Sequence, residues 1–133
     1  MTNHFFDNNI APAIAEALRA LDQKAIHICE CGAHDIARGD ADVDWMPKVA
    51  KLGWVAVTVD NNIQRRREER KVREACGLRV VYLPGKFGRA MQFFQQAVFI
   101  IRAWDNILDA TKGARSGQCF SVSERNHKVT LMT

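Results

Sequence analysis

Acidic residues directly follow two apolar segments that the sequence predicts to be strands. Asp7 comes after Phe5 and Phe6. Asp60 comes after the uncharged run from Val55 to Val59, and a β-branched run of this kind is typical of a strand buried on both faces of a parallel sheet. Open α/β sheets bind their ligands at the carboxyl ends of such strands. We therefore expect Asp7 and Asp60 to share one acidic site at one edge of a sheet.

Carboxylates that meet at one edge favour a divalent cation. Acidic side chains within about 4–6 Å of one another raise each other's pKa, so they cannot all stay ionised without a counter-charge. Mg²⁺ and Mn²⁺ take oxygen ligands, and Mg²⁺ typically uses one or two protein carboxylates together with waters and a substrate phosphate. Such an ion polarises a phosphodiester and supplies a hydroxide for in-line attack. The alternative is purely structural, because Asp and Asn also favour turns and helix caps.

The strands that must position these acids alternate with helices along the chain. Predicted strands cover residues 4–6, 25–29, 54–59 and 79–83, and predicted helices cover residues 10–21, 63–75 and 89–110, with a further helix from about residue 44. Residues 118–123 and 128–132 alternate apolar and polar side chains, which indicates a hairpin. About four strand–helix repeats predict an α/β fold in three α/β/α layers, with a mainly parallel sheet and a C-terminal β-hairpin.

Two further acidic residues reach the same edge through the topology. Right-handed crossovers place the carboxyl end of every parallel strand, and the start of every following helix, on one edge of the sheet. Asp42 and Asp44 precede a helix that leaves from that edge. Taken alone, Asp44 is better explained as the N-cap of this helix, because Pro47 then falls in the first turn, where its missing N–H is harmless. With Asp42 as the cap, Pro47 would remove a backbone hydrogen bond.

Length, composition and charge limit the class of protein. The 133 residues are 47% hydrophobic, which suits one globular domain over residues 1–133 with a substantial core. The 19 Lys and Arg against 15 Asp and Glu give a net charge of +4, which permits an anionic partner without requiring one. No apolar run approaches the roughly 18–20 residues of a membrane-spanning helix, and no export signal is visible. With four cysteines and no such signal, we expect reduced thiols in the cytoplasm.

The order and spacing of these segments resemble a PIN-like domain. The resemblance is carried by Phe5-Phe6-Asp7 before an Ala/Leu-rich helix, by Asp-Val-Asp-Trp at residues 42–45 and by Gly-Trp-Val-Ala-Val-Thr-Val-Asp at residues 53–60. It covers most of the chain and continues through Leu-Pro-Gly-Lys at residues 83–86 and the hairpin. In particular, the chain is similar to the compact PIN-like branch grouped with the toxin ribonucleases of bacterial toxin–antitoxin pairs. The resemblance implies a parallel sheet between helices and metal-dependent cleavage of RNA.

The resemblance also implies roles for individual residues. Asp7 matches the aspartate after the first strand of the family, and Asp60 matches the aspartate after the Thr-containing strand. Asp42 or Asp44 matches the acidic residue at the start of the intervening helix, and both alternatives stay open. Many relatives carry another acid two residues after the position of Asp60. This chain has Asn62 there, which can ligate a metal through its carbonyl but brings no negative charge.

Basic residues beside the acidic edge offer contacts for RNA. A basic flank would hold the polyanion while the metal acts on the scissile phosphate. The alternative is an ordinary solvated helix with ion pairs four residues apart, and both interpretations stay open. The candidate RNA contacts are Arg65, Arg66 and Arg67 on the helix after Asp60 and Lys86 in the Gly-flanked loop after the fourth strand. The ion pairs of the alternative are Glu69 with Arg73 and Arg70 with Glu74. For Lys86, a simple turn residue is the better explanation.

Two further patterns have a structural explanation that we prefer. The cluster of His27, Cys29, Cys31 and His34 contains competent zinc ligands, but Cys-x-Cys is not the usual ligand spacing, and buried reduced thiols explain the cysteines better. The helix at residues 89–110 carries an apolar stripe wider than a one-sided surface helix needs. The stripe consists of Phe93, Ala97, Ile100, Trp104 and Ile107, with Phe94, Val98 and Ile101 beside it. We expect it to be buried within the chain, with contact to a partner as the alternative.

The main hypothesis is therefore a cytoplasmic ribonuclease that depends on Mg²⁺ or Mn²⁺ and serves as the toxin of a toxin–antitoxin pair. Its expected partners are RNA and a cognate antitoxin protein, with a homodimer as a candidate assembly and no membrane. The candidate metal ligands are Asp7, Asp42, Asp44, Asp60 and Asn62, and Asn9 and Thr58 are further site candidates by position only.

Two alternatives compete with this hypothesis. The first is a PIN-like module that binds RNA or a protein without cutting it, because Asn62 has weakened the metal site. The second is a phosphoacceptor regulatory domain, which also places aspartates at strand ends. Such domains generally carry an adjacent acidic pair after the first strand, whereas Asp7 is followed by Asn8 and Asn9. The second alternative is therefore the weaker one.

Overall fold

The computed structural model describes residues 2–59 and 67–132, and within these ranges six strands form one sheet. The strands are β1 (His4–Phe6), β2 (Ala25–His27), β3 (Val55–Val59), β4 (Arg79–Leu83), β5 (Cys119–Val122) and β6 (Val129–Leu131). The helices are α1 (Pro12–Ala20), α2 (Asp42–Lys51), α3 (Arg67–Cys76), α4 (Gly85–Arg89) and α5 (Phe93–Lys112), with short 3₁₀ turns at Ile28–Glu30 and Gly32–His34. None of the helices in these ranges has the length and apolar character needed to cross a membrane.

The sheet has the order β2-β1-β3-β4-β5-β6, and its first five strands are parallel. Strand β6 pairs with β5 in the antiparallel sense and completes the C-terminal hairpin. All five residues of β3 are buried, as expected for a β-branched strand at the centre of a parallel sheet. Strand β1 lies directly beside it, with Phe5 opposite Ala56 and Phe6 opposite Val57.

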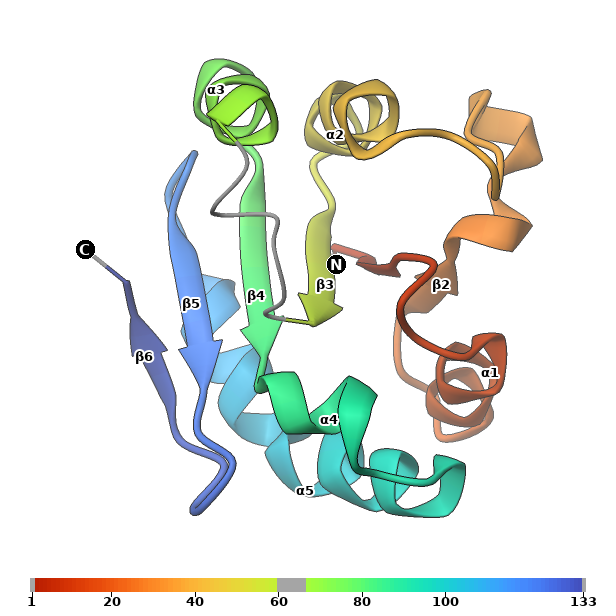
Figure 1. Ribbon diagram of the computed structural model, residues 1–133, viewed down its shortest axis with the longest axis vertical. Coiled ribbons are helices and arrows are strands. Elements are labelled where there is room, and N and C mark those ends of the chain that lie inside the picture. The colour runs from red at the N-terminus through yellow and green to blue at the C-terminus, as the bar shows by residue number, and fades with distance from the viewer. Residues whose placement is uncertain (1, 60–66, 133) are drawn as a thin grey trace.

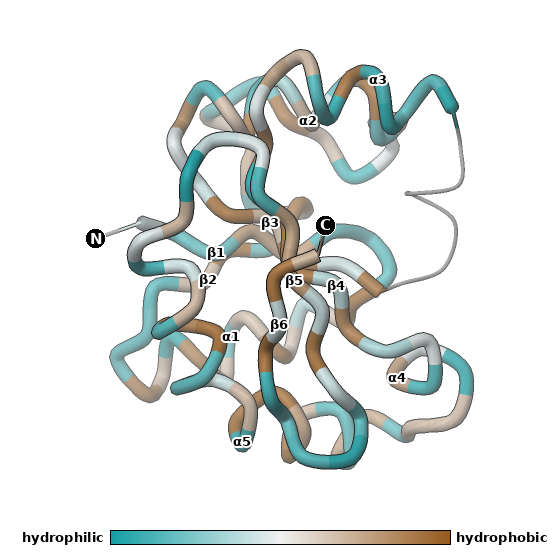
Figure 2. The backbone as a smooth tube through the Cα atoms, turned by 90° about the vertical axis from the view of Figure 1, so that its left-hand side faces the viewer, coloured by the Kyte–Doolittle hydropathy of each residue, from teal (hydrophilic) through white to brown (hydrophobic). Residues whose placement is uncertain are grey.

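Helices cover both faces of the sheet. Alternate residues of one strand point to opposite faces, so Phe6 and Phe5 belong to two separate hydrophobic clusters. The cluster around Phe6 packs against α1, α4 and α5, whereas the cluster around Phe5 packs against α2 and, more sparsely, α3. Figure 1 and the side view in Figure 2 both show α2 and α3 on one side of the strands and α1, α4 and α5 on the other. The fold is therefore the predicted three-layer arrangement.

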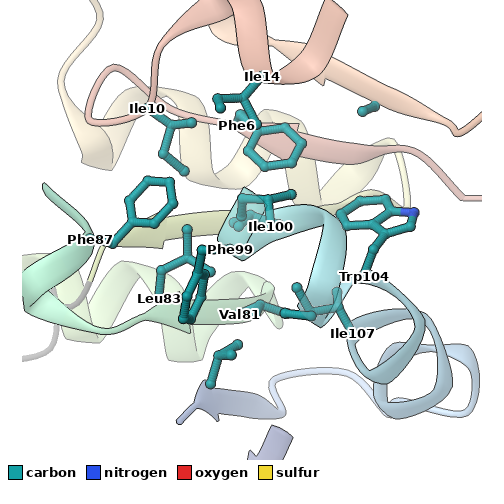
Figure 3. Close-up of a cluster of buried hydrophobic side chains, with 14 of the residues drawn as sticks. Phe6, Ile10, Ile14, Val81, Leu83, Phe87, Phe99, Ile100, Trp104 and Ile107 are labelled. Carbon is teal, nitrogen blue, oxygen red and sulfur yellow. The ribbon is translucent and has the colours of Figure 1, made fainter. Parts of the chain in front are cut away.

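The larger cluster joins the long helix α5 to the sheet. Figure 3 shows Ile100 and Trp104 from α5 between Phe6 of β1 and Val81 of β4, with Phe87 of α4 at the other end of the cluster. Ile100 and Phe87 are completely buried. A side chain of this size stabilises the fold by roughly 1.5–3 kcal/mol when it is removed from water. Helix α4 is thus anchored to the same core as α5.

The predicted strands at residues 4–6 and 79–83 and the predicted hairpin are present in the structure, but other elements differ from the prediction. Strand β2 stops at His27, because the side chain of His27 accepts a hydrogen bond from the N–H of Cys29 and caps a 3₁₀ turn. The residues after β4 form the short helix α4 instead of a loop. Helix α5 begins at Phe93 and not at residue 89. The predicted helix at residues 63–75 is described from Arg67 onward, and Gly77 follows its end with a φ of 70°.

The prediction that Asp44 caps α2 is wrong. The N-cap is Ala41, which makes no side-chain hydrogen bond, and the helix begins at Asp42. Pro47 therefore lies inside the helix, where it removes one backbone hydrogen bond. Burial of Trp45 and Met46 against the sheet offsets this loss. Tertiary packing, and not the capping preference of Asp44, decides where α2 starts.

Candidate acidic site

The site is built around Asp7, which follows β1 at the carboxyl edge of the sheet. Its side chain is only 2% exposed. Thr58 Oγ1 donates a hydrogen bond of 2.5 Å to Asp7 Oδ2, and the backbone N–H of Asn9 donates one of 3.1 Å to Asp7 Oδ1. The amide Nδ2 of Asn9 lies 3.4 Å from Asp7 Oδ2 as a third donor. Asp7 is thus a buried carboxyl group with donors on both oxygens.

The register of the two central strands explains this contact. Phe6 lies opposite Val57, so Asp7 comes next to Thr58, one residue further along. Asp7 and Thr58 follow the alternation of Phe5 and Ala56, whose side chains face α2. The site therefore opens toward the start of α2.

The electrostatics of Asp7 are unusual for a carboxyl group. Burial raises its pKa from 3.8 to about 6, and the hydrogen bonds from Thr58 and Asn9 partly oppose this rise. The negative charge of Asp42 raises the pKa further, so the two carboxyl groups lie near enough to interact. A nearby cation would offset the cost of desolvating the charge and would also screen the repulsion from Asp42.

Asp42 is held in place by an aromatic side chain. It is half-buried at the first position of α2, and its Oδ1 accepts a hydrogen bond of 3.0 Å from Trp45 Nε1. The indole ring of Trp45 is buried, with its centre 4.9 Å from the ring of Phe5. Phe5 lies in β1, two residues before Asp7, so Trp45 ties Asp42 to the strand that carries Asp7.

The remaining acidic candidates do not join this group in the described part of the chain. Asp44 is exposed in the first turn of α2, and Asp42 is the acid that acts on the pKa of Asp7 among the described residues. Asp60 and Asn62 lie outside the described residues. Within the described ranges, no three His, Cys, Asp or Glu side chains are grouped so that they could hold a metal ion. Two carboxylates nevertheless fit the coordination habits of Mg²⁺, which keeps several waters.

The basic candidates fall into three groups. Arg65 and Arg66 lie outside the described residues. Arg67 is exposed at the start of α3. Lys86 is exposed in α4, and its Nζ lies 3.5 Å from Glu124 Oε1 in the hairpin turn. The predicted pair of Arg70 with Glu74 is present at 3.1 Å, so part of α3 is an ordinary ion-paired surface.

The described residues do not support a zinc site at His27. The Nε2 of His27 lies 2.7 Å from the carbonyl oxygen of Ile10, which can only accept, so Nε2 carries the proton. Its Nδ1 accepts the N–H of Cys29. The ring therefore supports the turn that follows Asp7 and is not free to bind a metal. The prediction of buried thiols holds for Cys31 and Cys119, whereas Cys29 is exposed and Cys76 half-buried; all four cysteines are free.

One supporting residue escaped the sequence analysis. Trp45 was not selected as part of the site, although it lies three residues after Asp42, a spacing that places two side chains on one face of a helix. The signal was present in Asp-Val-Asp-Trp, but a tryptophan near the start of an amphipathic helix is also an ordinary core residue.

The fold and this geometry agree with the comparison of the chain with known families. The family described as PIN like domain matches residues 2–85, which is more than half of the sequence. The chain therefore belongs to the PIN-like domain family, and PIN domains are typically nucleases. The match spans β1 to β4 and contains Asp7, Asp42 and Thr58. No curated protein and no solved structure matches the chain.

Proposed function

We propose that this protein is a ribonuclease that depends on Mg²⁺ or Mn²⁺. The observation that carries the proposal is the buried carboxyl group of Asp7, whose pKa is raised by burial and by the neighbouring charge of Asp42. Ionising a buried carboxyl group beside a second carboxylate costs free energy, and a hard divalent cation offsets this cost by supplying a counter-charge. When bound, such an ion polarises a phosphodiester and lowers the pKa of an attacking water.

The residues of the chain have separate tasks in this proposal. Thr58 and Asn9 donate to the oxygens of Asp7 and thereby favour its ionised form, which is the form that binds a metal. Trp45 holds one oxygen of Asp42 and leaves the other for the ion. Asp60, which follows β3 in the sequence, is proposed as the third carboxylate, with Asn62 as a neutral ligand. Because supporting hydrogen bonds orient metal ligands, these contacts are part of the proposed site.

Basic residues would hold the RNA substrate. The exposed Arg67 at the start of α3 and Lys86 in α4 are proposed as phosphate contacts, together with Arg65 and Arg66. Lys86 forms an ion pair with Glu124, with 3.5 Å between Nζ and Oε1. Because both side chains are exposed, this pair is weak, and a phosphate could take the place of Glu124.

The biological setting follows from the resemblance to toxin ribonucleases. We propose that the protein acts in the cytoplasm as the toxin of a toxin–antitoxin pair, with a cognate antitoxin protein as partner and a homodimer as its assembly. Four free cysteines are in keeping with a reducing compartment. Co-purification with the product of a neighbouring small gene tests the antitoxin, and sedimentation tests the dimer.

The first test of the proposed function compares two aspartates on the same helix turn. Asp42→Asn should lower Mn²⁺-dependent cleavage of a single-stranded RNA roughly a hundredfold or more, because it removes the charge beside Asp7 while keeping the bond to Trp45. Asp44→Asn is the matched control, since it makes the same change on an exposed residue of the same turn, and should cut as fast as the parent. Equal rates for all three proteins, or equal losses in both variants, would contradict these roles.

A second candidate function is favoured by Asn62. A site with one fewer negative charge holds a divalent ion less tightly, which would leave a PIN-like module that binds RNA or a protein without cutting. Thermal unfolding with increasing Mn²⁺ separates the two functions, because a ligand that binds only the folded state raises the melting temperature. No rise at millimolar Mn²⁺, together with retained RNA binding, would favour the binding module.

A further inference from the structure

Two adjacent phenylalanines at the start of α5 contradict the prediction that the apolar stripe of this helix is buried throughout. Phe93 is 74% exposed and Phe94 is 79% exposed, whereas Ile100, Trp104 and Ile107 further along the helix are buried as predicted. Large apolar side chains exposed next to each other mark a surface that binds something.

The two rings border a hollowed surface. One cavity of about 400 Å³ is lined by Phe94, Val98 and Arg102 among others, and a second of about 540 Å³ is lined by Met91, Gln92, Phe93 and Phe94. Met91 and Phe94 line both hollows, so the two adjoin each other. Both volumes fall in the range of small-molecule sites.

The charges around these rings are positive. Arg102 lines the first cavity, and Lys86 and Arg89 belong to α4, which ends just before the rings. Neither Arg89 nor Arg102 forms an ion pair within the described parts of the chain. The first turn of α5 contains no acidic residue, and the start of a 20-residue helix favours negative charge. Lys86 is paired weakly with Glu124, so Arg89 and Arg102 are the cations without an ion pair among the described residues. A surface of exposed aromatic rings beside such cations fits a polyanion that carries planar groups.

Helix α4 connects this surface to the acidic site. It begins two residues after β4, and a Cβ at Gly88 would lie 3.5 Å from Val59 Cγ1, so the helix packs on the end of β3. The ring of Phe87 is buried, with its centre 5.9 Å from that of Phe99 in α5. Figure 1 shows α4 beyond the arrowhead of β4, between the sheet edge and the start of α5. The aromatic surface therefore has a fixed position relative to the edge that carries Asp7.

We propose that Phe93, Phe94 and Met91 form a stacking platform for bases of single-stranded RNA beyond the cleavage point, with Lys86, Arg89 and Arg102 contacting the phosphates. The inference rests on the proposed function, because it assigns the same substrate to a second part of the molecule. Every base has a flat π-face, so such a platform binds single strands without reading their sequence. A duplex of the same sequence keeps its bases stacked internally and cannot use the platform.

The test measures binding without cleavage. Short single-stranded RNA carrying 2-aminopurine is titrated with the protein in EDTA, and affinity and fluorescence quenching are both recorded at several salt concentrations. The double variant Phe93→Ala, Phe94→Ala should bind roughly tenfold or more weakly and lose the quenching. Its salt dependence should stay unchanged, because stacking releases no counterions. In contrast, Arg89→Ala should weaken binding of every sequence and reduce the salt slope by about one.

The matched control is Ile101→Ala, which removes another exposed apolar side chain of α5, 49% exposed, that borders neither cavity. It should bind RNA like the parent. Unchanged affinity and quenching in the double variant would overturn the proposal. A parent dimer that becomes a monomer in the double variant, with RNA affinity unchanged, would overturn it in favour of a protein interface. Because these measurements use EDTA, they do not depend on whether the protein cuts RNA. Absence of Mn²⁺-dependent cleavage would contradict the proposed function, whereas weaker RNA binding by the double variant would still support the stacking platform.

Discussion

Strand β1 has a buried titratable side chain near each end, and the two ends accommodate burial differently. His4, at the amino end, is 4% exposed, and burial lowers its pKa to about 4, with the charge of Arg79 as a second cause. Asp7, just past the carboxyl end, is 2% exposed, and its pKa is raised to about 6. At pH 7, therefore, His4 is neutral, whereas Asp7 is ionised in a buried position.

The hydrogen bonds explain why His4 stays neutral. Thr111 Oγ1 donates to the carbonyl oxygen of Ile107, so it accepts at 3.0 Å from His4 Nε2, which must carry the proton. The other ring nitrogen, Nδ1, has no hydrogen-bond partner among the described residues, and the ring packs edge-on against Trp104. A charged imidazolium would bury a second N–H without an acceptor. His4 is thus a core residue that avoids the cost of burial by giving up its charge.

Asp7 keeps hydrogen-bond donors that favour its charge, although burial and Asp42 oppose that charge. Thr58 and Asn9 donate to it, while Asp42 adds a second negative charge within reach. The structure thus maintains a buried negative charge that its own described residues do not neutralise. Burial of a titratable side chain therefore does not by itself indicate a functional site, since His4 is buried as well. A buried charge that is retained without a neutralising partner among the described residues does indicate one.

The largest expected effect is on activity, where the two buried groups of β1 should differ. Asp7→Asn should reduce Mn²⁺-dependent RNA cleavage roughly a thousandfold or more, because a metal ligand contributes several kcal/mol to transition-state stabilisation. His4→Phe changes the other buried group of β1 and should retain the cleavage rate of the folded protein. The measurement is initial cleavage rate at saturating Mn²⁺, with circular dichroism to verify folding. Undiminished cleavage by Asp7→Asn would remove Asp7 from the proposed site.

The second prediction concerns the pH dependence of the free energy of unfolding, to which His4 and Asp7 contribute with opposite signs. The pKa of His4 is lowered from 6.5 to about 4 in the folded state, so the unfolded state takes up the proton at a higher pH than the folded state does. The contribution of His4 to stability is therefore lost as pH falls from about 6.5 to 4. A pKa raised from 3.8 to about 6 has the opposite sign, so the contribution of Asp7 is lost as pH rises from about 3.8 to 6. Each shift corresponds to roughly 3 kcal/mol.

In the parent, the contributions of His4 and Asp7 to the slope of stability against pH largely cancel between pH 4 and 6. A variant that lacks one of these groups should reveal the contribution of that group. Relative to the parent, Asp7→Asn should gain stability as pH rises, reaching about 3 kcal/mol above pH 6, because the buried charge is gone. The difference curve of His4→Phe should have the opposite slope. Urea unfolding without divalent ions at half-unit pH steps measures both. Parallel curves for parent and variants would show that neither group has a shifted pKa.

Much of the fold could be predicted from the sequence because its signals are local. The buried run Val55–Val59 indicated the central strand, and the alternation of strands and helices indicated a parallel sheet whose carboxyl edge carries Asp7. The contact of Asp7 with Thr58 followed from strand order and register only after the two strands were known to be neighbours. The hydrogen bond between Trp45 and Asp42 has the three-residue spacing of a helix, but the same spacing fits an ordinary core tryptophan, so the sequence alone could not favour Asp42 over Asp44.

The exposed start of α5 shows another limit of sequence patterns. Phe93 continues the same periodic stripe as Ile100 and Trp104, so its spacing predicts burial. A 20-residue helix is about 30 Å long, whereas a five-residue strand spans only about 17 Å. A helix of this length need not be buried along its whole length, and periodicity cannot tell which part is exposed. The exposed part is the first turn, which carries the two rings.

The smallest expected effect compares the two threonines that support the two ends of β1. Thr58→Val removes the hydroxyl that donates to Asp7 and should destabilise the protein by about 1.5–3 kcal/mol at pH 8, the range for hydrogen bonds to charged groups. Thr111→Val removes a bond between neutral groups and should cost about 0.5–1.5 kcal/mol. Near pH 5 Asp7 is largely protonated, so Thr58→Val should lose less stability there than at pH 8. The stability lost in Thr111→Val should be the same at both pH values, because His4 is neutral at both. Urea unfolding at pH 5 and pH 8 gives the four differences. If Thr58→Val were equally destabilised at both pH values, its hydroxyl would not distinguish the charged form of Asp7, and the two ends of the strand would be alike in this respect.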